Sequence, residues 1–215
     1  MYGNKLTTLA GLSGLRQLTH VYAQDNLLEE LGFEASPSLE SMLAGGNRLA
    51  RVSGLHNASG MRELRLGGQR PASLAGNIHK TPLELERESL WGLSSSLRVL
   101  DLSDCGVGDG ALAPLVVLRR LERLDLSRNA LSGTDELREL LLRLPLILSL
   151  QVDSNPLCSK LRWRDPLVRS AESLSSLNGA EVTAQERSFL QKLAARQLAP
   201  PRQRPPRPPR DGKGL

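Results

Sequence analysis

The chain has 215 residues, a net charge of +5, two cysteines and only 3% aromatic residues. So few cysteines exclude a disulfide-stabilised secreted domain or a cysteine-ligated zinc module, and so few rings are unusual for a compact globule of this size. No stretch reaches the roughly 18 consecutive apolar residues of a membrane span, and Met1 is not followed by a signal peptide, so we expect a cytoplasmic protein without membrane contact.

Leucines recur every three residues in the first segment of the chain, at Leu6, Leu9, Leu12 and Leu15. This spacing suits 3₁₀ turns, which have three residues per turn, and a similar pattern returns at residues 47–55. No strand pattern precedes Leu6. Either an upstream piece is missing, or the first apolar layer of the fold is exposed.

Between residues 18 and 157 the chain repeats one pattern six times. An apolar residue is followed by two free positions, an apolar residue, one free position, an apolar residue, two free positions and usually Asn. The copies begin at Leu18, Leu39, Met61, Leu97, Leu121 and Ile147, so consecutive starts are 21, 22, 36, 24 and 26 residues apart. The pattern resembles the leucine-rich repeat, in which each unit must stack on its neighbours to bury its apolar face.

The copy at residues 121–131, LERLDLSRNAL, indicates how one unit folds. Leu124 and Leu126 point into the core, and the residues between them point outward from a short strand. Asn129 then turns the chain, and its amide can bond the backbone of adjacent turns. We therefore predict an α/β leucine-rich-repeat solenoid with a curved parallel sheet on its concave side and 3₁₀ turns and short helices on its convex side. Its asparagine ladder would contain Asn26, Asn47, Asn129 and Asn155.

Two units depart from the pattern at the ladder position. Cys105 replaces Asn in the fourth unit, where a small residue is acceptable. Gln69 replaces it in the third unit and is followed by Pro71, which predicts an irregular turn there. Residues 72–96 are an insertion, within which residues 82–91 have the composition of a short helix.

The C-terminal part of the chain predicts a helix and a cap. Residues 135–144, DELRELLLRL, combine strong helix formers with an apolar stripe. Residues 158–198 are expected to cap the open end of the solenoid, which spans residues 1–157, because exposed apolar rungs need a cover. A Thr-x-x-Glu capping box at Thr183 predicts the start of the cap helix.

Residues 199–215 carry most of the positive charge. They hold five basic residues and one acidic residue, which leaves 23 basic and 22 acidic residues in the rest of the chain. A nearly neutral body argues against a nucleic-acid partner. The tail is too rich in proline for helix or sheet, so we expect a disordered polyproline-II segment. Arg202, Pro205 and Pro208 also match a ligand of proline-binding domains, and both interpretations stay open.

The sequence contains no recognisable catalytic or metal-binding motif. His20, His56 and His79 are scattered, and no motif places a nucleophile or a carboxylate beside them. Cys105 and Cys158 lie far apart without metal-ligand spacing, so we interpret both as structural thiols. We expect neither enzyme activity, nor a cofactor, nor a metal.

The outward residues of the predicted concave strands form a rigid array that suits a protein partner. Acidic side chains are frequent in its C-terminal half, so a partner with basic groups fits, and the alternative is a solvated face without a partner. The candidate partner-binding residues are Tyr22, Arg65, Asp101, Asp104, Arg123, Asp125 and Asp153. Among them, Asp101, Asp125 and Tyr22 rank first.

The irregular features of the chain identify a family more specifically than its leucines do. Those features, in chain order, are Gln69-Arg70-Pro71 with its insertion, Asn155-Pro156-Leu157-Cys158, Arg164-Asp165 and Glu186-Arg187-Ser188-Phe189-Leu190. Over roughly residues 64–197 the chain resembles the protein phosphatase 1 regulatory subunit 42 family of testis leucine-rich-repeat proteins. The resemblance implies a non-catalytic regulatory or scaffolding subunit that binds the catalytic subunit of protein phosphatase 1, at microtubules, centrosomes or cilia.

The cap by itself is similar to that of a wider intracellular group, which includes nuclear phosphatase regulators, axonemal dynein light chain 1 and the small nuclear ribonucleoprotein A-prime. Two alternatives therefore stay open. One is an axonemal or ciliary structural protein that contacts tubulin or dynein chains without a phosphatase, and the other is a ribonucleoprotein-associated protein. Residues 160–163, KLRW, nearly match a phosphatase docking motif, but we expect Trp163 to pack within the cap.

Overall fold

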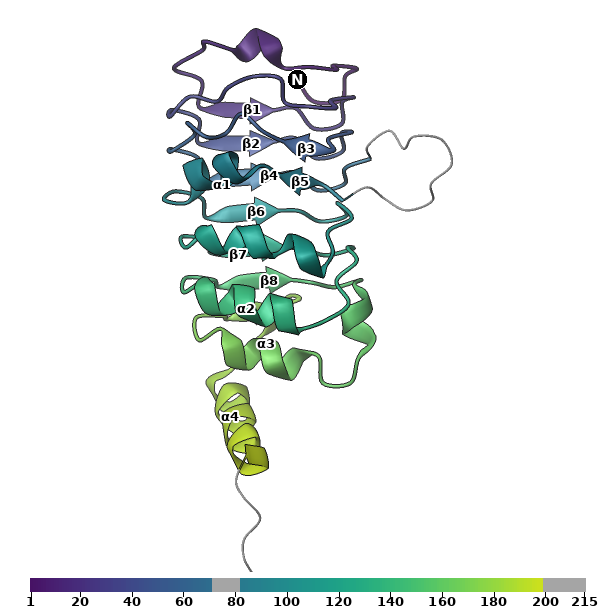
Figure 1. Cartoon of the computed structure of the whole chain (residues 1–215), viewed down its shortest axis with the longest axis vertical. Helices are drawn as coiled ribbons and strands as arrows, with labels where there is room; N and C mark the ends of the chain where they lie inside the picture. Colours follow the sequence, from purple (N-terminus) through teal and green to yellow (C-terminus); the bar gives the residue numbers. More distant parts are fainter. Residues whose placement is uncertain (71–81, 199–215) are drawn as a thin grey trace, which may run out of the picture.

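The chain folds into an elongated stack of rungs, seen in Figure 1 with the N-terminus at the top. The structure, a computed structural model, describes residues 1–70 and 82–198. One sheet runs along the stack in the order β1-β2-β4-β6-β7-β8-β9-β10, and all of its pairs are parallel except β9 and β10. Its strands are β1 (His20–Tyr22), β2 (Ser41–Leu43), β4 (Glu63–Arg65), β6 (Val99–Asp101), β7 (Arg123–Asp125), β8 (Ser149–Gln151), β9 (Ser176–Leu177) and β10 (Ala180–Glu181).

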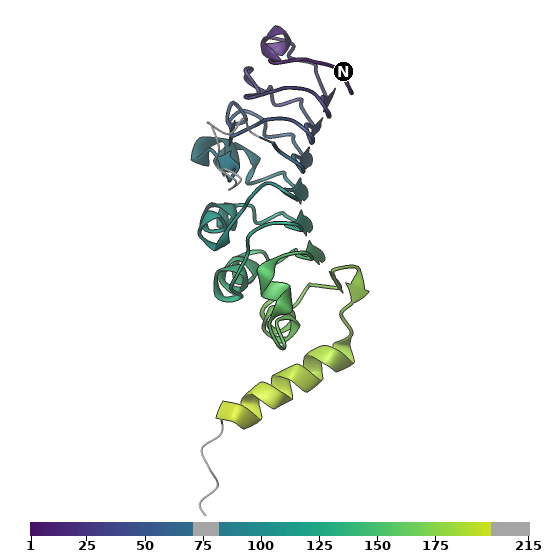
Figure 2. The same cartoon turned by 90° about the vertical axis from the view of Figure 1, so that its right-hand side faces the viewer.

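Helices and turns cover the side of the stack opposite the sheet. Figure 2 shows the strands along the concave side and the helices along the convex side, with the last helix leaving the end of the stack. The covering elements are η1 (Ala10–Leu12), α1 (Arg87–Leu93), η2 (Asp109–Ala111), η3 (Ala113–Val117), α2 (Asp135–Arg143), η4 (Pro156–Ser159) and α3 (Arg164–Ser170), and the last helix is α4 (Ala184–Leu198). A second, two-stranded parallel sheet joins β3 (Arg51–Val52) to β5 (Glu84–Leu85).

The second sheet accounts for one wrong prediction and for one helix that begins later than expected. We predicted 3₁₀ turns over residues 47–55, but β3 lies there because Arg51 and Val52 pair with Glu84 and Leu85. For the same reason the helix predicted within residues 82–91 begins only at Arg87. The helix predicted at residues 135–144 is confirmed as α2.

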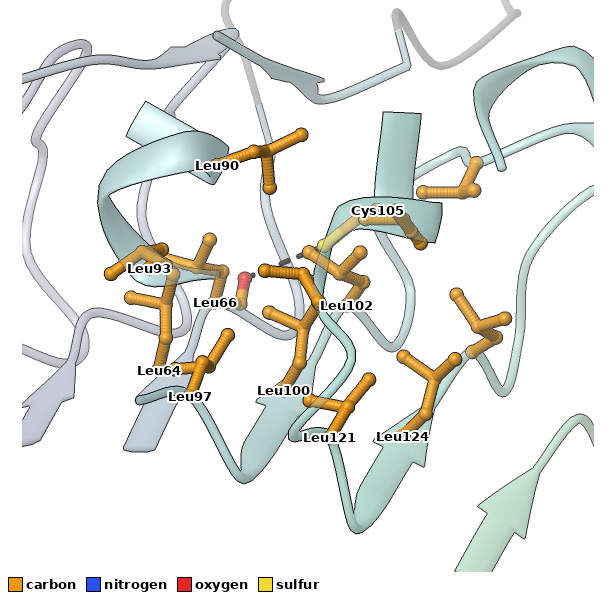
Figure 3. Packing of buried hydrophobic residues seen from close by; sticks show 14 of the residues in the cluster. Leu64, Leu66, Leu90, Leu93, Leu97, Leu100, Leu102, Cys105, Leu121 and Leu124 are labelled. Carbon is orange, nitrogen blue, oxygen red and sulfur yellow. Dashed lines mark hydrogen bonds between the residues drawn. The ribbon is translucent and has the colours of Figure 1, made fainter. Parts of the chain in front are cut away.

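The segment expected as an insertion contributes to the common core. Its described residues, 82–96, include α1, whose Leu90 and Leu93 are buried. Figure 3 shows these two leucines above Leu64 and Leu66 of the third unit. The remaining positions of the expected insertion, up to Thr81, lie outside the described residues.

The core consists of equivalent leucines stacked from rung to rung. Leu64, Leu100 and Leu124 are paired in register in β4, β6 and β7, and each is 1% exposed (Figure 3). Leu97 and Leu121, which precede two of these strands, are fully buried beside them. Each such side chain contributes about 1.5–3 kcal/mol by leaving water. The hydrophobic core thus runs along the whole stack and is built mainly from leucines, with few of the large aromatic side chains that fill the core of many globular domains.

Buried side-chain amides, stacked from rung to rung, form a ladder beside the leucine core. We call the leucine core and this ladder together the spine of the solenoid. The Oδ1 atom of Asn129 accepts the backbone N–H groups of Cys105 and Val107 at 3.0 and 2.9 Å. Its Nδ2 atom donates to the carbonyls of Leu102, Leu126 and Ser127 at 2.8–3.1 Å. Asn26, Asn47 and Asn155 bond in the same manner, as the sequence predicted.

Gln69 continues the ladder, so the irregular turn predicted at this residue is wrong as far as Arg70. The Oε1 atom of Gln69 accepts the N–H of Leu49 at 2.9 Å, and its Nε2 atom donates to the carbonyls of Ala44 and Leu66. The glutamine amide can replace an asparagine amide because the side chain is 1% exposed and fixed between two rungs. At Cys105 the Sγ atom lies 3.4 and 3.3 Å from the carbonyl oxygens of Leu66 and Ser103, so its single S–H can donate to either one and replaces part of the donor half of the pattern.

Two arginines hold the C-terminal end together. The Arg187 guanidinium donates to the carbonyls of Val168, in the last turn of α3, and of Ala171 and Leu174, which follow the helix. Arg164 forms an ion pair with Glu186 at 2.8 Å and also donates to backbone carbonyls of the β9–β10 hairpin. One half of the predicted capping box is present, since the Thr183 hydroxyl accepts the N–H of Glu186 at 3.1 Å.

Candidate protein-binding face

The register of the sheet aligns outward side chains into columns along the concave face. Each three-residue strand presents two outward residues, because successive residues of a strand point to opposite faces. The central column, as we call it, consists of Tyr22, Leu43, Arg65, Asp101, Asp125 and Gln151. Four of the predicted partner-binding residues, Tyr22, Arg65, Asp101 and Asp125, lie in this column. Arg123 lies in the neighbouring column, between Val99 and Ser149.

Asp104 and Asp153 do not lie on the strands. Both follow the C-terminal ends of their strands and border the concave face there. Asp104 forms an ion pair with Arg70, with 3.0 Å between Nη1 and Oδ2. Its carboxylate therefore meets a partner only in competition with a contact inside the chain.

Asp101 and Asp125 are adjacent in the central column, one on β6 and one on β7. The Oδ1 atom of each accepts the N–H of the serine two residues later, Ser103 or Ser127, at 2.9 Å. This bond fixes the carboxylate. In the described part of the chain no cation forms an ion pair with either aspartate, so the pair presents negative charge to the concave face.

The charges near the N-terminal half of the face are balanced. The Arg65 Nε atom lies 2.6 Å from the Glu63 Oε1 atom, and the Ser41 hydroxyl donates to the same carboxylate at 3.1 Å. The hydrogen bond from Arg65 lowers the pKa of Glu63. Tyr22 is half exposed and its ring lies 6.1 Å from the His20 ring. This half of the face therefore offers rings and neutral pairs, and the other half offers carboxylates.

Glycines form a recess that we did not predict. A hollow of about 500 Å³ at the C-terminal ends of β1, β2 and β4 is lined by Asp25, Asn26, Leu27, Gly46, Asn47, Arg48, Gly67, Gly68 and Arg70. Gly46 and Gly68 have φ angles of +68° and +76°, in the position where other units use Asp25 or Asp104. A Cβ on Gly67 would lie 2.4 Å from the Ser103 Oγ atom. Gly-Gly at the same place in two consecutive units was the available sequence signal.

Other hollows lie away from this face. One of about 980 Å³ is formed by turns of the first units and is lined by residues such as Arg16, Glu34 and His56. Over residues 1–70 and 82–198, no cluster of three or more His, Cys, Asp or Glu side chains is arranged to hold a metal ion. In the same part of the chain, no helix has the length and apolar character to cross a membrane.

The two thiols and the possible docking motif are explained by packing. Cys105 is 2% exposed, and burial raises the pKa of its thiol to about 12, so the group is inert at neutral pH. Burial also raises the pKa of Cys158. In the 160–163 segment Trp163 packs partly buried against the core, while Leu161 is 93% exposed. The two side chains thus do not form one exposed apolar-aromatic motif.

Comparison with known proteins agrees with this architecture. Residues 93–116 match the family described as Leucine Rich repeat. The chain is a leucine-rich-repeat solenoid. An internalin, InlF of Listeria monocytogenes, is similar at 18% identity over 83% of this chain, with a TM-score of 0.53, and this likeness shows the fold alone. The solenoid spans about half, 52%, of that internalin chain.

Two more solved structures have lower TM-scores. A chain of the Drosophila melanogaster SNF/U2A′ complex matches the solenoid at 16% identity over 83% of this chain and 69% of that chain, with a TM-score of 0.37. A chain of the Chaetomium Mex67:Mtr2 structure matches at 24% identity over 50% of this chain and 68% of that chain, with a TM-score of 0.39.

Proposed function

We propose that this solenoid is a non-catalytic scaffold that binds a partner protein on its concave face. The observation that carries the proposal is the central column, in which side chains of one rigid sheet stand in register and in contact with solvent. Such a surface is already organised before binding, so a partner orders few side chains when it docks. Repeat solenoids provide extended binding surfaces of this kind.

The charge on the column defines the chemistry of the partner. Asp101 and Asp125 lie side by side and take Lys or Arg groups, while Leu43 and Tyr22 offer apolar contact two and three rungs from Asp101. Aromatic side chains and charged pairs of this kind often dominate binding energy at interfaces. The partner surface should therefore contain basic residues beside an apolar patch.

The catalytic subunit of protein phosphatase 1 is the partner that we propose first. The resemblance of residues 64–197 to the regulatory subunit 42 family supports this choice, and cytoplasmic sites at microtubules, centrosomes or cilia follow from the same resemblance. Arg164, Glu186 and Arg187 belong to the segments that carry the resemblance and also hold the cap in place. Tubulin or dynein chains bound without phosphatase, or a ribonucleoprotein, are the competing outcomes.

A binding experiment with charge-matched variants tests the proposal. Asp101→Asn with Asp125→Asn removes two charges but keeps an amide oxygen for the N–H groups of Ser103 and Ser127. The control is Glu88→Gln with Glu139→Gln, which removes two exposed charges from α1 and α2 on the convex side. We expect the first pair, and not the control, to weaken capture of the purified phosphatase subunit about tenfold. Equal capture by both double variants would refute binding through the central column.

A further inference from the structure

Three arginines from consecutive rungs converge at the edge of the sheet where the strands begin. Arg62 and Arg98 immediately precede β4 and β6, and the backbone N–H of Arg98 donates to the Arg62 carbonyl at 2.9 Å. Arg120 lies in the turn before the next rung. Together with Ser59, Gly60, Ser95 and Ser96 they line a hollow of about 370 Å³, which we name the arginine pocket.

No ion pair in the described part of the chain neutralises the charges of two of these arginines. Arg98 forms an ion pair with Glu122, which fixes its guanidinium at the rim. Among the described residues, the side chains of Arg62 and Arg120 take part in no hydrogen bond or ion pair. Arg187, in contrast, donates to three backbone carbonyls that hold the cap. The arginine pocket therefore concentrates positive charge that no internal contact explains.

A serine of the pocket also lacks a partner. The Ser96 hydroxyl oxygen is hidden from solvent, and no group in the described part of the chain hydrogen-bonds to it. A buried polar group without a partner is uncommon in native proteins and often indicates a missing ligand or water. Ser59 and Ser95 add two more hydroxyl donors to the same lining.

We propose that the arginine pocket binds the phosphate group of a phosphorylated serine or threonine in a partner protein. Guanidinium groups bind phosphate through paired N–H donors, and a phosphate monoester offers three strong acceptor oxygens for such donors. A hollow of this size accommodates one phosphorylated side chain, since it lies at the lower end of small-ligand pockets. The exposed hydroxyl groups of Ser59 and Ser95 supply the neutral donors.

A protein source fits the surroundings better than nucleic acid does. Glu40 and Glu122 occupy the positions equivalent to Arg62 and Arg98 in the rungs on either side. The positive charge is therefore confined to the pocket and does not continue along the sheet edge. A nucleic-acid backbone would require a continuing basic track, with aromatic rings for its bases. The pocket also borders Glu63 and Val99 at the start of the concave strands, within reach of a protein bound there.

This inference rests on the proposed scaffold function and adds a chemical requirement for the partner. The test measures fluorescence anisotropy of the full chain with a peptide pool of one fixed phosphoserine and random neighbours. The same pool with serine, a single-stranded RNA oligonucleotide and inorganic phosphate as competitor are the other probes. We expect the phosphorylated pool to bind at least about tenfold more tightly than the serine pool.

Two double variants connect the binding to the pocket. Arg62→Gln with Arg120→Gln should lower the affinity for the phosphorylated pool about tenfold. Arg143→Gln with Arg169→Gln removes the same charge from exposed positions of α2 and α3 and should leave the affinity unchanged. Circular dichroism confirms that each variant is folded.

Three results would overturn the inference. They are equal binding of the two peptide pools, equal losses in both double variants, and RNA binding as tight as that of the phosphorylated pool. Displacement of the pool by an equal concentration of inorganic phosphate would also overturn it, because the peptide would then contribute nothing. None of these probes contains the phosphatase. Failure here therefore leaves the capture experiment with Asp101 and Asp125 intact, and failure there leaves phosphopeptide binding intact.

Discussion

Replacing Asn129 by alanine should remove the best-connected step of the ladder. The substitution deprives the buried N–H groups of Cys105 and Val107 of their acceptor and removes three donor bonds to carbonyls. Each buried donor left without an acceptor costs about 1–3 kcal/mol, so the two together cost about 4 kcal/mol of folding free energy. A native domain is stable by only about 5–15 kcal/mol, so the change should be large.

Urea unfolding followed by circular dichroism measures this loss, and amide hydrogen exchange locates it. Asn26→Ala should cost about half as much, because its Oδ1 atom accepts one N–H group, that of Leu6. Asn57→Ala, at an exposed site, is the control and should change stability by less than about 0.5 kcal/mol. If Asn129→Ala and Asn57→Ala unfold at the same urea concentration, or if Cys105 and Val107 keep their exchange protection, the amide bonds do not stabilise the spine.

Two predictions concern the cap. Arg187→Ala should leave the carbonyls of Val168, Ala171 and Leu174 without their donor. The docking of α4 should lose about 2–3 kcal/mol, which faster amide exchange in the helix would measure. The control is Arg196→Ala, on the exposed side of the same helix, which should have no such effect. The hydrogen bond from Arg164 lowers the pKa of Glu186, so this bond stabilises the folded cap above the usual pKa near 4.5 and is lost as the pH falls below it. Acid should therefore speed amide exchange in α4 of the natural chain. In a Glu186→Gln variant, which lacks the titrating carboxylate, this extra acid dependence should disappear. If the variant and the natural chain show the same acid dependence of exchange in α4, the assignment is contradicted.

The sequence was sufficient to predict the repeating part of the fold. Alternation around Leu124 predicted strands, the recurrent Asn predicted the ladder, and the leucine stripe of residues 135–144 predicted α2. These features are local, because each is set by residues a few positions apart. The common register then follows, since equivalent residues of each unit occupy equivalent places in the sheet.

Contacts between distant residues could not be predicted in the same way. The ion pair of Arg70 with Asp104 joins residues 34 positions apart, and the arginine pocket requires the register across the 36-residue third unit. The irregular turn predicted at Gln69 was also wrong, because this unexpected side chain forms the hydrogen bonds expected of asparagine. A substitution at a repeat position shows that the chemistry differs, but only the packing shows whether the function of that position is kept.

The two exceptions in the ladder have a joint consequence for how the sequence can change. At each other step, the ladder amide accepts an N–H from the residue two positions after the preceding ladder residue, as Asn47 does from Leu28 and Asn155 from Leu131. At the step from Gln69 to Cys105 the thiol supplies no amide oxygen, and the residue two positions after Gln69 is a proline, which has no N–H. The missing acceptor and the missing donor thus fall on the same step. An Asn at position 105 alone would bury an acceptor without its usual donor. Positions 71 and 105 are therefore expected to change together, although 34 residues separate them.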